Sequence, residues 1–404
     1  MDHLPTSPLA PTPLPQAIPV RGVQFFTSNT GLKYRGRDDL FLALLAEGTV
    51  GAGSFTQNQV TGAPVDWTRA ALGNGTGPRA LIVNAGNANV ANGAAGAACC
   101  TEVAQGLAST LCLEAGQIWQ ASTGVIGEAL AATPLIEAAQ QALTAGEAAP
   151  TAAAAACLTT DTFVKMARRP CEIDGQSVTL SGFAKGSGMI QPNMATLLAF
   201  AFTDVQIEAE VLQPLHQRAV EATLNAITVD SDSSTSDMAL TFATGQGAKI
   251  SDFKAFEAEL TALYQDLAKL VIRDGEGASK FIEITVHGAA SRGEAKVLAF
   301  AVANSPLVKT TISGGDANWG RILMALGKAG VAFDPQAVTV ALGGLPVVAG
   351  GARVDPYEES PVTAHLRGQE ISLEIEVGTG PGTFRVWTCD LTQGYISINA
   401  DYRS

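Results

Sequence analysis

A single threonine stands where a glycine-containing loop meets an apolar segment, and it has the chemistry of a nucleophile. The stretch KGSGMIQPNMATLLAF covers residues 185–200, and Thr196 directly precedes the apolar run 197–202. This run is short and ends at a polar pair, so it predicts a buried strand. If the Ala195–Thr196 bond were cut, Thr196 would carry a hydroxyl group and a free α-amine, which form a nucleophile with its own general base. Ala-Thr recurs elsewhere in the chain, so a plain loop-to-strand junction is the alternative.

Other residues with usable chemistry lie among glycines. Thr123 and Gly124 end a predicted strand, at a point where backbone N–H groups can be free. The other candidates are hydroxyl, amide or charged side chains: Thr162, Lys185, Glu276, Asn399 and Ser404. One lysine and one glutamate suit a zwitterionic ligand, because each charge of the ligand can be paired separately. For each of these residues, a plain surface position is the alternative.

Metal and nucleotide chemistry find little support in the sequence. The acidic run DSDSSTSD at 230–237 has Thr235 where a calcium loop needs glycine and Thr241 where it needs glutamate. A hydrogen-bonded polar loop is therefore the preferred interpretation, with no metal. No phosphate-binding glycine motif and no C-x-x-C pair occur, and none of the four histidines lies in a recognisable catalytic motif. We expect no cofactor.

Composition narrows the class of protein. The 404 residues carry a formal net charge of −13, which argues against a nucleic-acid partner. No apolar run is long enough to predict a transmembrane helix. The six cysteines are scattered and are expected to be reduced thiols, as in a cytoplasmic protein.

The elements that must position these residues mix helices and strands without regular β-α-β spacing, so we expect an α+β fold. Residues 1–19 contain six prolines and predict a disordered or extended lead. The amide-rich run 84–89 follows a predicted strand and precedes a predicted helix over about 94–110. It can be interpreted as a functional loop or as a simple turn. Segments 371–377 and 384–391 alternate around a glycine-rich connection and predict a hairpin.

Taken together, motifs across nearly the whole chain after residue 20 resemble the ornithine acetyltransferase family of arginine biosynthesis. The matching segments are NAGNANVANG (84–93), STGVIG (122–127), TTDTFVK (159–165), AKGSGMIQPNMATLLAF (184–200), ITVDSDSST (227–235), DGEGASK (274–280), ANSPLVKT (303–310), DANWGRI (316–322) and CDLTQGYISINADYRS (389–404). The long central motif is the most specific of them.

The resemblance implies a fold and a processing event. It implies the layered α/β/β/α core of the ornithine acetyltransferase and self-cleaving aminopeptidase fold, with a smaller C-terminal α+β lobe over about 285–404. Members of the family cleave themselves before the central threonine. Here the cut would fall between Ala195 and Thr196, giving an alpha chain whose ordered part is 20–195 and a beta chain 196–404. Two chains of each kind would form a heterotetramer.

The resemblance also implies an activity. Thr196 would take acetyl from N2-acetyl-L-ornithine as an acetyl-enzyme, release ornithine and pass the acetyl group to L-glutamate. Thr123 and Gly124 match the family's oxyanion-stabilising pair. The positions that match its substrate contacts are Thr162, Lys185, Thr196, Glu276, Asn399 and Ser404. We would pair Lys185 with a substrate carboxylate and Glu276 with the side-chain ammonium of ornithine. Members differ in whether acetyl-CoA is also a donor, and no residue here decides it.

The sequence departs from the family pattern in places. The run DSDSSTSDM lacks the usual glycine after its first aspartate, which puts the rate of cleavage in question. Ser279 and Ser404 replace threonine but keep the hydroxyl group. Two rival functions remain open: a self-cleaving aminopeptidase or amidase that uses water as acceptor, and a non-catalytic amino-acid-binding protein.

Overall fold

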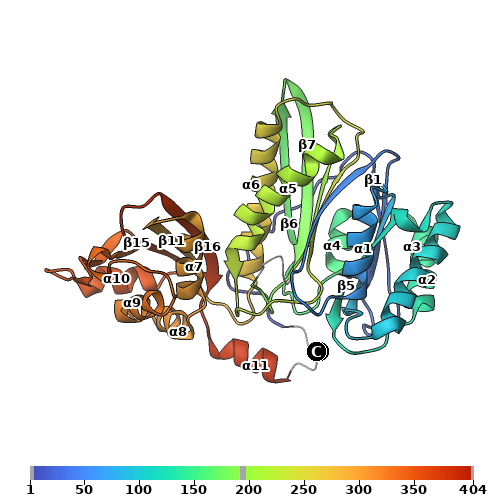
Figure 1. The fold of residues 1–404 in the computed structure, drawn as a ribbon. Helices are drawn as coiled ribbons and strands as arrows, with labels where there is room; N and C mark the ends of the chain where they lie inside the picture. The colour runs from blue at the N-terminus through green and yellow to red at the C-terminus, as the bar shows by residue number, and fades with distance from the viewer. Residues whose placement is uncertain (1–3, 192–196, 402–404) are drawn as a thin grey trace. The chain divides into compact units, whose positions relative to one another are not determined.

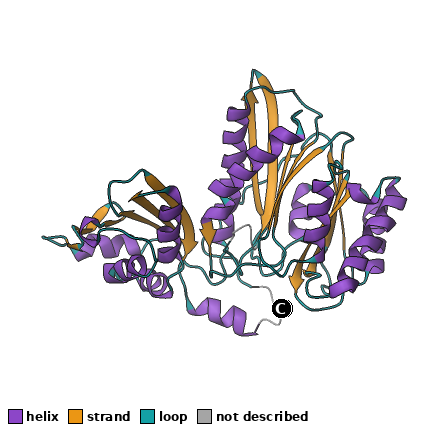
Figure 2. Ribbon diagram, viewed as in Figure 1, coloured by secondary structure: helices purple, strands orange, loops and turns teal. Residues whose placement is uncertain are grey.

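The computed structural model describes residues 4–191 and 197–401, and the chain divides into two compact units. Among the described residues, the larger unit comprises 11–191, 197–225 and 232–271, and the smaller unit comprises 4–10, 226–231 and 272–401. Figure 1 traces the chain, and Figure 2 shows that both units mix helices with sheet.

Two sheets stack face to face in the larger unit. The first sheet has the spatial order β1 (Val23–Ser28), β2 (Leu40–Leu45), β4 (Ala80–Asn87) and β5 (Ile118–Val125). The second has the order β3 (Val50–Phe55), β10 (Met238–Ala243), β8 (Leu198–Thr203), β7 (Gln176–Lys185) and β6 (Lys165–Ile173). Their facing side chains form one apolar cluster rich in phenylalanine. Such interdigitation is typical of sandwich cores.

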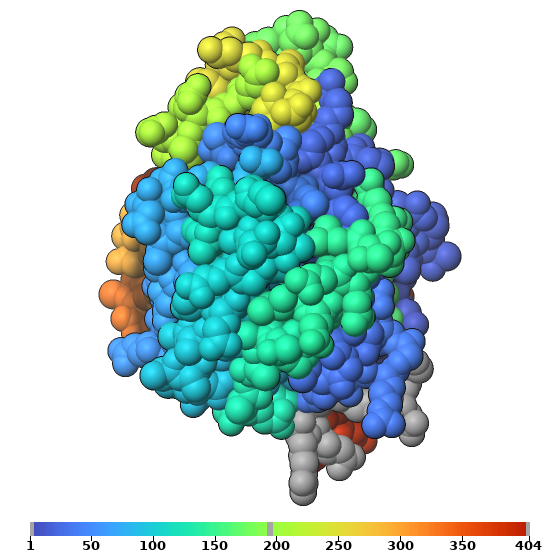
Figure 3. Space-filling model, turned by 90° about the vertical axis from the view of Figure 1, so that its right-hand side faces the viewer, coloured from blue at the N-terminus to red at the C-terminus, as the bar shows by residue number. Residues whose placement is uncertain are grey.

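Helices complete the layers of the larger unit. The helices α2 (Gly93–Leu111) and α3 (Ala132–Ala145) pack on the outer face of the first sheet, and Figure 3 views them from outside in cyan and teal. Two others, α5 (Ala209–Ala222) and α6 (Phe253–Arg273), lie beside the second sheet (Figure 1). Two short helices, α1 (Ala63–Gly73) and α4 (Pro150–Ala156), add small side chains to the core between the sheets. The predicted α/β/β/α layering and the helix over 94–110 are therefore confirmed.

Strand β8 begins two residues after Thr196, and all six of its residues are buried. It pairs parallel with β10 and antiparallel with β7, so it is a central strand. Phe200 and Phe202 pack into the aromatic core, where Phe41 and Phe200 have ring centroids 5.6 Å apart in an edge-to-face arrangement. Because strands covered on both faces read as continuous apolar runs, the prediction of a buried strand here is confirmed.

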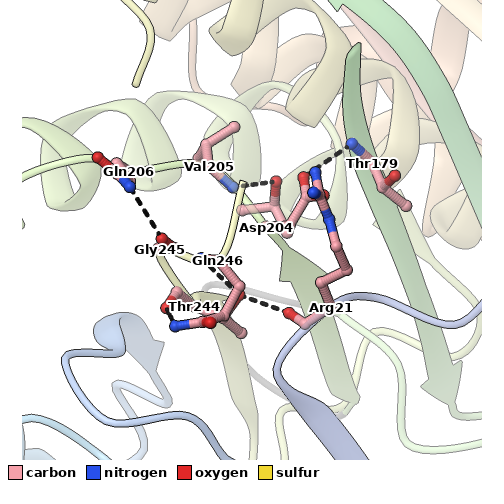
Figure 4. Close-up of polar contacts among 9 residues, drawn as sticks. Arg21, Thr179, Asp204, Val205, Gln206, Thr244, Gly245 and Gln246 are labelled. Atoms are coloured by element: carbon pink, nitrogen blue, oxygen red, sulfur yellow. Dashed lines mark hydrogen bonds and ion pairs between the residues drawn. The ribbon is translucent and has the colours of Figure 1, made fainter. Parts of the chain in front are cut away.

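A polar network holds the opposite end of β8 (Figure 4). Arg21 donates from Nε and Nη2 to Oδ2 of Asp204, at 2.9 and 2.7 Å. The other carboxylate oxygen accepts the N–H of Thr179 at 3.0 Å, and the Asp204 side chain is 1% exposed. Arg21 and Thr179 precede the proposed cut and Asp204 follows it, so this network would join the two product chains.

The smaller unit is built on a seven-stranded sheet. Its order is β14 (Ala352–Arg353), β13 (Leu345–Ala349), β12 (Thr339–Leu342), β15 (Glu370–Glu376), β11 (Phe281–Ala289), β16 (Gly382–Cys389) and β9 (Ile227–Thr228). Its helices are α7 (Arg292–Ala303), α8 (Pro306–Gly314), α9 (Trp319–Gly327), α10 (Glu359–Leu366) and α11 (Gln393–Asp401). The α+β lobe expected over about 285–404 lies in this unit, which also includes residues 4–10, 226–231 and 272–284.

The predicted hairpin of 371–377 and 384–391 is wrong. Strands β15 and β16 both exist, but β11 lies between them, parallel to β15 and antiparallel to β16. The glycine-rich connection instead crosses the end of β11, where the N–H of Gly380 bonds to the carbonyl of Gly288. Alternation indicated two half-buried strands correctly, but it carries no information about which strand is the neighbour.

The described residues of the proline-rich lead are extended, and part of the lead is buried. Residues 4–19 contain no helix or strand, Leu9 is 4% exposed, and the N–H of Ile18 bonds to the Ser181 hydroxyl at 3.0 Å. All six cysteines lie in the described ranges and none forms a disulfide. Within residues 4–191 and 197–401, no helix is both long and apolar enough to cross a membrane.

Candidate active site

Thr123 and Gly124 lie at the end of β5, where it pairs with β4. Gly124 stands opposite Gly86 and has a φ of +128°, which side chains disfavour. A Cβ atom at this position would lie 2.3 Å from the carbonyl carbon of Gly86. Only glycine therefore fits between the two strand ends. The neighbouring Thr123 side chain is 8% exposed, and its hydroxyl has no hydrogen-bond partner among the described residues.

The amide-rich run braces this strand end. The Ser122 hydroxyl donates to Oδ1 of Asn84 at 2.5 Å, and the Asn84 amide donates to the carbonyl of Asn87 at 2.9 Å. Both Ser122 and Asn84 are buried. Amide side chains here hydrogen-bond backbone groups that irregular conformations leave without a ladder partner. The run has a structural role that directly supports the Thr123–Gly124 position.

A buried ion pair shapes the loop that contains Thr162. Asp161 accepts a hydrogen bond from Nζ of Lys165 at 2.6 Å and another from the N–H of Gly186 at 2.7 Å. Neither side chain of the Asp161–Lys165 pair is exposed. Burial raises the pKa of Asp161, but the charges of Lys165 and Lys185 lower it further, to about 2. Asp161 is therefore ionised at neutral pH, and its carboxylate holds this loop to Gly186.

Lys185 is the last residue of β7 and stands opposite Leu198 in the register. Its side chain is half-buried, and its ammonium group forms no ion pair or hydrogen bond with any other described residue. Asp161 is near enough for its pKa to respond to the Lys185 charge. An ammonium group without a bonded partner at the edge of a buried site is suited to pair with a ligand carboxylate.

The loop at residues 29–38 links the first sheet to the Thr162 loop. A Cβ atom at Gly86 would lie 3.1 Å from Tyr34, so this loop covers the β4–β5 end. Arg37 in the same loop donates to the carbonyl of Leu158 at 2.8 Å. The structure therefore brings Thr123, Gly124, Thr162 and Lys185 to one end of the larger unit.

Glu276 and Asn399 come together within the smaller unit. Nδ2 of Asn399, on α11, donates to Oε2 of Glu276 at 2.7 Å, and Glu276 is 9% exposed. A Cβ atom at Gly277 would lie 2.4 Å from the backbone nitrogen of Tyr395, so the loop that contains Glu276 packs closely against the first turn of α11. The Ser279 hydroxyl donates to Asp390 at 2.6 Å.

Three predicted site residues, Ala195, Thr196 and Ser404, lie outside the described residues. The structure places the other candidates in two groups. Thr123, Gly124, Thr162 and Lys185 lie in the larger unit, and Glu276 and Asn399 lie in the smaller unit.

The acidic run forms hydrogen bonds and gathers no metal ligands. In its part within the larger unit, the carbonyl of Ser234 accepts from the Thr56 hydroxyl at 2.7 Å, and the carbonyl of Asp232 accepts from the N–H of Gln191 at 2.9 Å. Across the described ranges, no three His, Cys, Asp or Glu side chains are grouped so that they could hold a metal ion.

Sequence reasoning missed two aspartates at this end of the larger unit. Asp161 was hidden inside a motif in which only Thr162 was singled out. Asp237 belongs to the acidic run that the sequence predicts as a polar loop, yet it is 3% exposed and precedes β10. Its position directly before the largely apolar run 238–243 is the signal in the sequence that could have indicated burial.

Comparisons with known proteins agree with these motifs. The model of the ArgJ family matches residues 24–404. An arginine biosynthesis bifunctional protein ArgJ from Gluconobacter oxydans is 48% identical, with 99% of this chain and 96% of that protein covered. Its counterpart from Agrobacterium fabrum is 44% identical, with 98% and 99% covered. A crystal structure of argJ from Bacillus halodurans has 37% identity and a TM-score of 0.49, and the match covers 51% of this chain and 99% of that one.

Proposed function

The chain belongs to the ArgJ family, and from this premise we propose that it transfers acetyl from N2-acetyl-L-ornithine to L-glutamate in arginine biosynthesis. The observation that carries the proposal is the ammonium group of Lys185, which has no bonded partner among the described residues and stands opposite Leu198, two residues after Thr196. Both substrates are amino acids with a carboxylate, which such a cation can pair.

The proposed chemistry begins with self-cleavage. The Thr196 hydroxyl attacks the Ala195 carbonyl carbon, the amide nitrogen leaves with a proton, and water hydrolyses the resulting ester. Thr196 then carries a free α-amine, which can act as general base for its own hydroxyl. This hydroxyl attacks the acetyl carbonyl of acetylornithine, and ornithine leaves as the protonated amine. The amino group of glutamate next attacks the acetyl ester and restores the hydroxyl.

The surrounding residues have separate roles in this proposal. Thr123 and Gly124 would stabilise the oxyanion of each tetrahedral intermediate, a contribution worth roughly 100- to 1000-fold per donor. Lys185 would bind the substrate carboxylate and Glu276 the side-chain ammonium of ornithine. The remaining proposed substrate contacts are Thr162, Asn399 and Ser404.

The proposal also includes the cofactors, a second acetyl donor and the assembly of the enzyme. No metal or cofactor takes part, and acetyl-CoA is a candidate second donor to glutamate. Cleavage gives chains 1–195 and 196–404, of which two copies each form a heterotetramer in the cytoplasm. Size-exclusion chromatography with light scattering measures the assembly, and acetyl-CoA with glutamate tests the second donor.

One assay tests the proposed reaction. The purified protein is given acetylornithine with and without glutamate, and both ornithine and acetylglutamate are quantified. The proposal expects ornithine release to depend on glutamate and to match acetylglutamate one for one. Ornithine release that ignores glutamate would instead identify a hydrolase of the aminopeptidase or amidase kind. An uncut chain without turnover would indicate an amino-acid-binding protein.

A further inference from the structure

Asp237 is a buried carboxyl group to which the proposed mechanism gives no role. It is 3% exposed, and its Oδ2 atom has no hydrogen-bond partner among the residues that the structure describes. Leaving such an atom without a partner costs free energy, so an orphaned carboxyl oxygen in a core calls for a functional explanation.

The contacts of Asp237 point to the start of β8. Its carboxyl group accepts hydrogen bonds from the N–H of Leu197 and from the Ser234 side chain. The next residue of the chain, Met238, donates its N–H to the carbonyl of Leu197 at 3.1 Å. Leu197 is therefore held on both its N–H and its carbonyl by consecutive residues at the start of β10. The nitrogen of Leu197 is bonded to the carbonyl carbon of residue 196, so Asp237 anchors the peptide that directly follows the proposed nucleophile.

The backbone of Asp237 is itself fixed, which makes it a rigid anchor. Its carbonyl accepts the N–H of Thr56 at 3.0 Å, immediately after β3. The strand that follows pairs with β3 on one side and β8 on the other. Functional groups set on rigid elements hold their geometry more closely than groups on loops.

The electrostatic surroundings favour a neutral carboxyl group. Burial raises the pKa of Asp237 well above its ordinary value, against a smaller lowering by Lys185. A neutral Asp237 leaves the ammonium of Lys185 available for a substrate carboxylate, whereas a charged one would compete for it. Asp237 would then act through the oxygen atom that accepts the N–H of Leu197 and through its shape, and asparagine has both.

We propose that Asp237 is a positioning residue for the proposed acyl transfer, and that it acts by holding the Leu197 peptide, and through it residue 196, in register for attack. This inference rests on the proposed function. A displacement of about 1 Å at a reacting group can reduce turnover about 100-fold.

The chain offers a matched control for this idea. Asp204 is also a buried aspartate of the second sheet, but it follows the opposite end of β8. We would compare Asp237→Ala, Asp237→Asn and Asp204→Ala with the unsubstituted protein. Each is measured for the fraction cleaved on a denaturing gel, for melting temperature, and for kcat and KM per cleaved chain with acetylornithine and glutamate.

The expected pattern separates positioning from general destabilisation. Asp237→Ala should lower kcat about 100-fold with KM changed less than about threefold, and Asp237→Asn should recover to within about tenfold of the unsubstituted protein. Asp204→Ala should keep kcat within about threefold, even if it melts earlier. The inference is overturned if Asp237→Ala keeps its kcat, if asparagine does not restore it, or if Asp204→Ala loses as much. Absence of transfer in the unsubstituted protein would instead reject the proposed function.

Discussion

Replacement of Gly124 by alanine tests the oxyanion position without removing a functional group. The added Cβ atom would lie 2.3 Å from the carbonyl carbon of Gly86 and 2.6 Å from the backbone nitrogen of Asn87. Real Cβ contacts stay above 3.0 Å, so the strand ends must separate by at least 0.7 Å. Because both contacts are backbone atoms, no side chain can rotate away to relieve the overlap.

The magnitude follows from that displacement. A shift approaching 1 Å at groups that must meet a developing charge costs about 100-fold in rate, equal to about 2.7 kcal/mol of activation free energy. We therefore expect Gly124→Ala to lower kcat about 100-fold and to slow self-cleavage. The assay is acetylglutamate formation from acetylornithine at saturating glutamate, normalised to cleaved chain.

Gly127→Ala is the matched control in the same segment. Gly127 also has a positive φ, +84°, but a Cβ atom there meets nothing within 4 Å. Both variants bear the backbone strain of a side chain at positive φ, typically 1–3 kcal/mol, and only Gly124→Ala adds the overlap. Gly127→Ala should keep kcat within about threefold. Equal activity of the two variants would refute the view that the close β4–β5 approach matters for catalysis.

Three further predictions address the rest of the larger unit. Asp161→Asn should cost about 3 kcal/mol of unfolding free energy at neutral pH, because it leaves Lys165 buried without its anion. The pKa of Asp161 is lowered from 3.8 to about 2, so its contribution is fully present above pH 4 and lost as the pH falls toward 2. Urea titrations at pH 6 and pH 3 should therefore show a smaller difference at pH 3; a constant difference would contradict this. Arg21→Ala should lower unfolding free energy by about 1 kcal/mol in urea, a modest loss because the arginine is largely exposed although Asp204 is buried; no change would mean that the pair adds nothing. Lys185→Met should raise KM for acetylornithine at least about tenfold, and an unchanged KM in steady-state assays would assign the carboxylate to another group.

Part of this structure could be predicted from local sequence. The apolar run after Thr196 forms the buried strand β8, as its sequence predicts. Lys185 is half-buried and Glu276 is buried, and their roles in binding a zwitterion stay predictions. The strand prediction is confirmed because a strand that is covered on both faces reads as a continuous apolar run in the sequence.

Other features depend on contacts between distant segments. The insertion of β11 between β15 and β16 follows from a parallel pairing that no local pattern encodes. Asp237 is set apart from the other acidic residues of its run by contacts of the folded chain: its carboxyl group accepts the N–H of Leu197, and the charge of Lys185 affects its pKa. The same holds for the brace between Ser122 and Asn84, which are far apart in sequence but lie on paired strands.

The most direct test of the central claim is intact mass spectrometry of the purified protein, before and after acetylornithine is added without glutamate. We expect two chains, the second beginning at Thr196, and a gain of one acetyl group on that chain alone, located at Thr196 by fragmentation and lost when glutamate is supplied. A chain that stays uncut, or a cut protein whose acetyl group lies elsewhere or never forms, would contradict it.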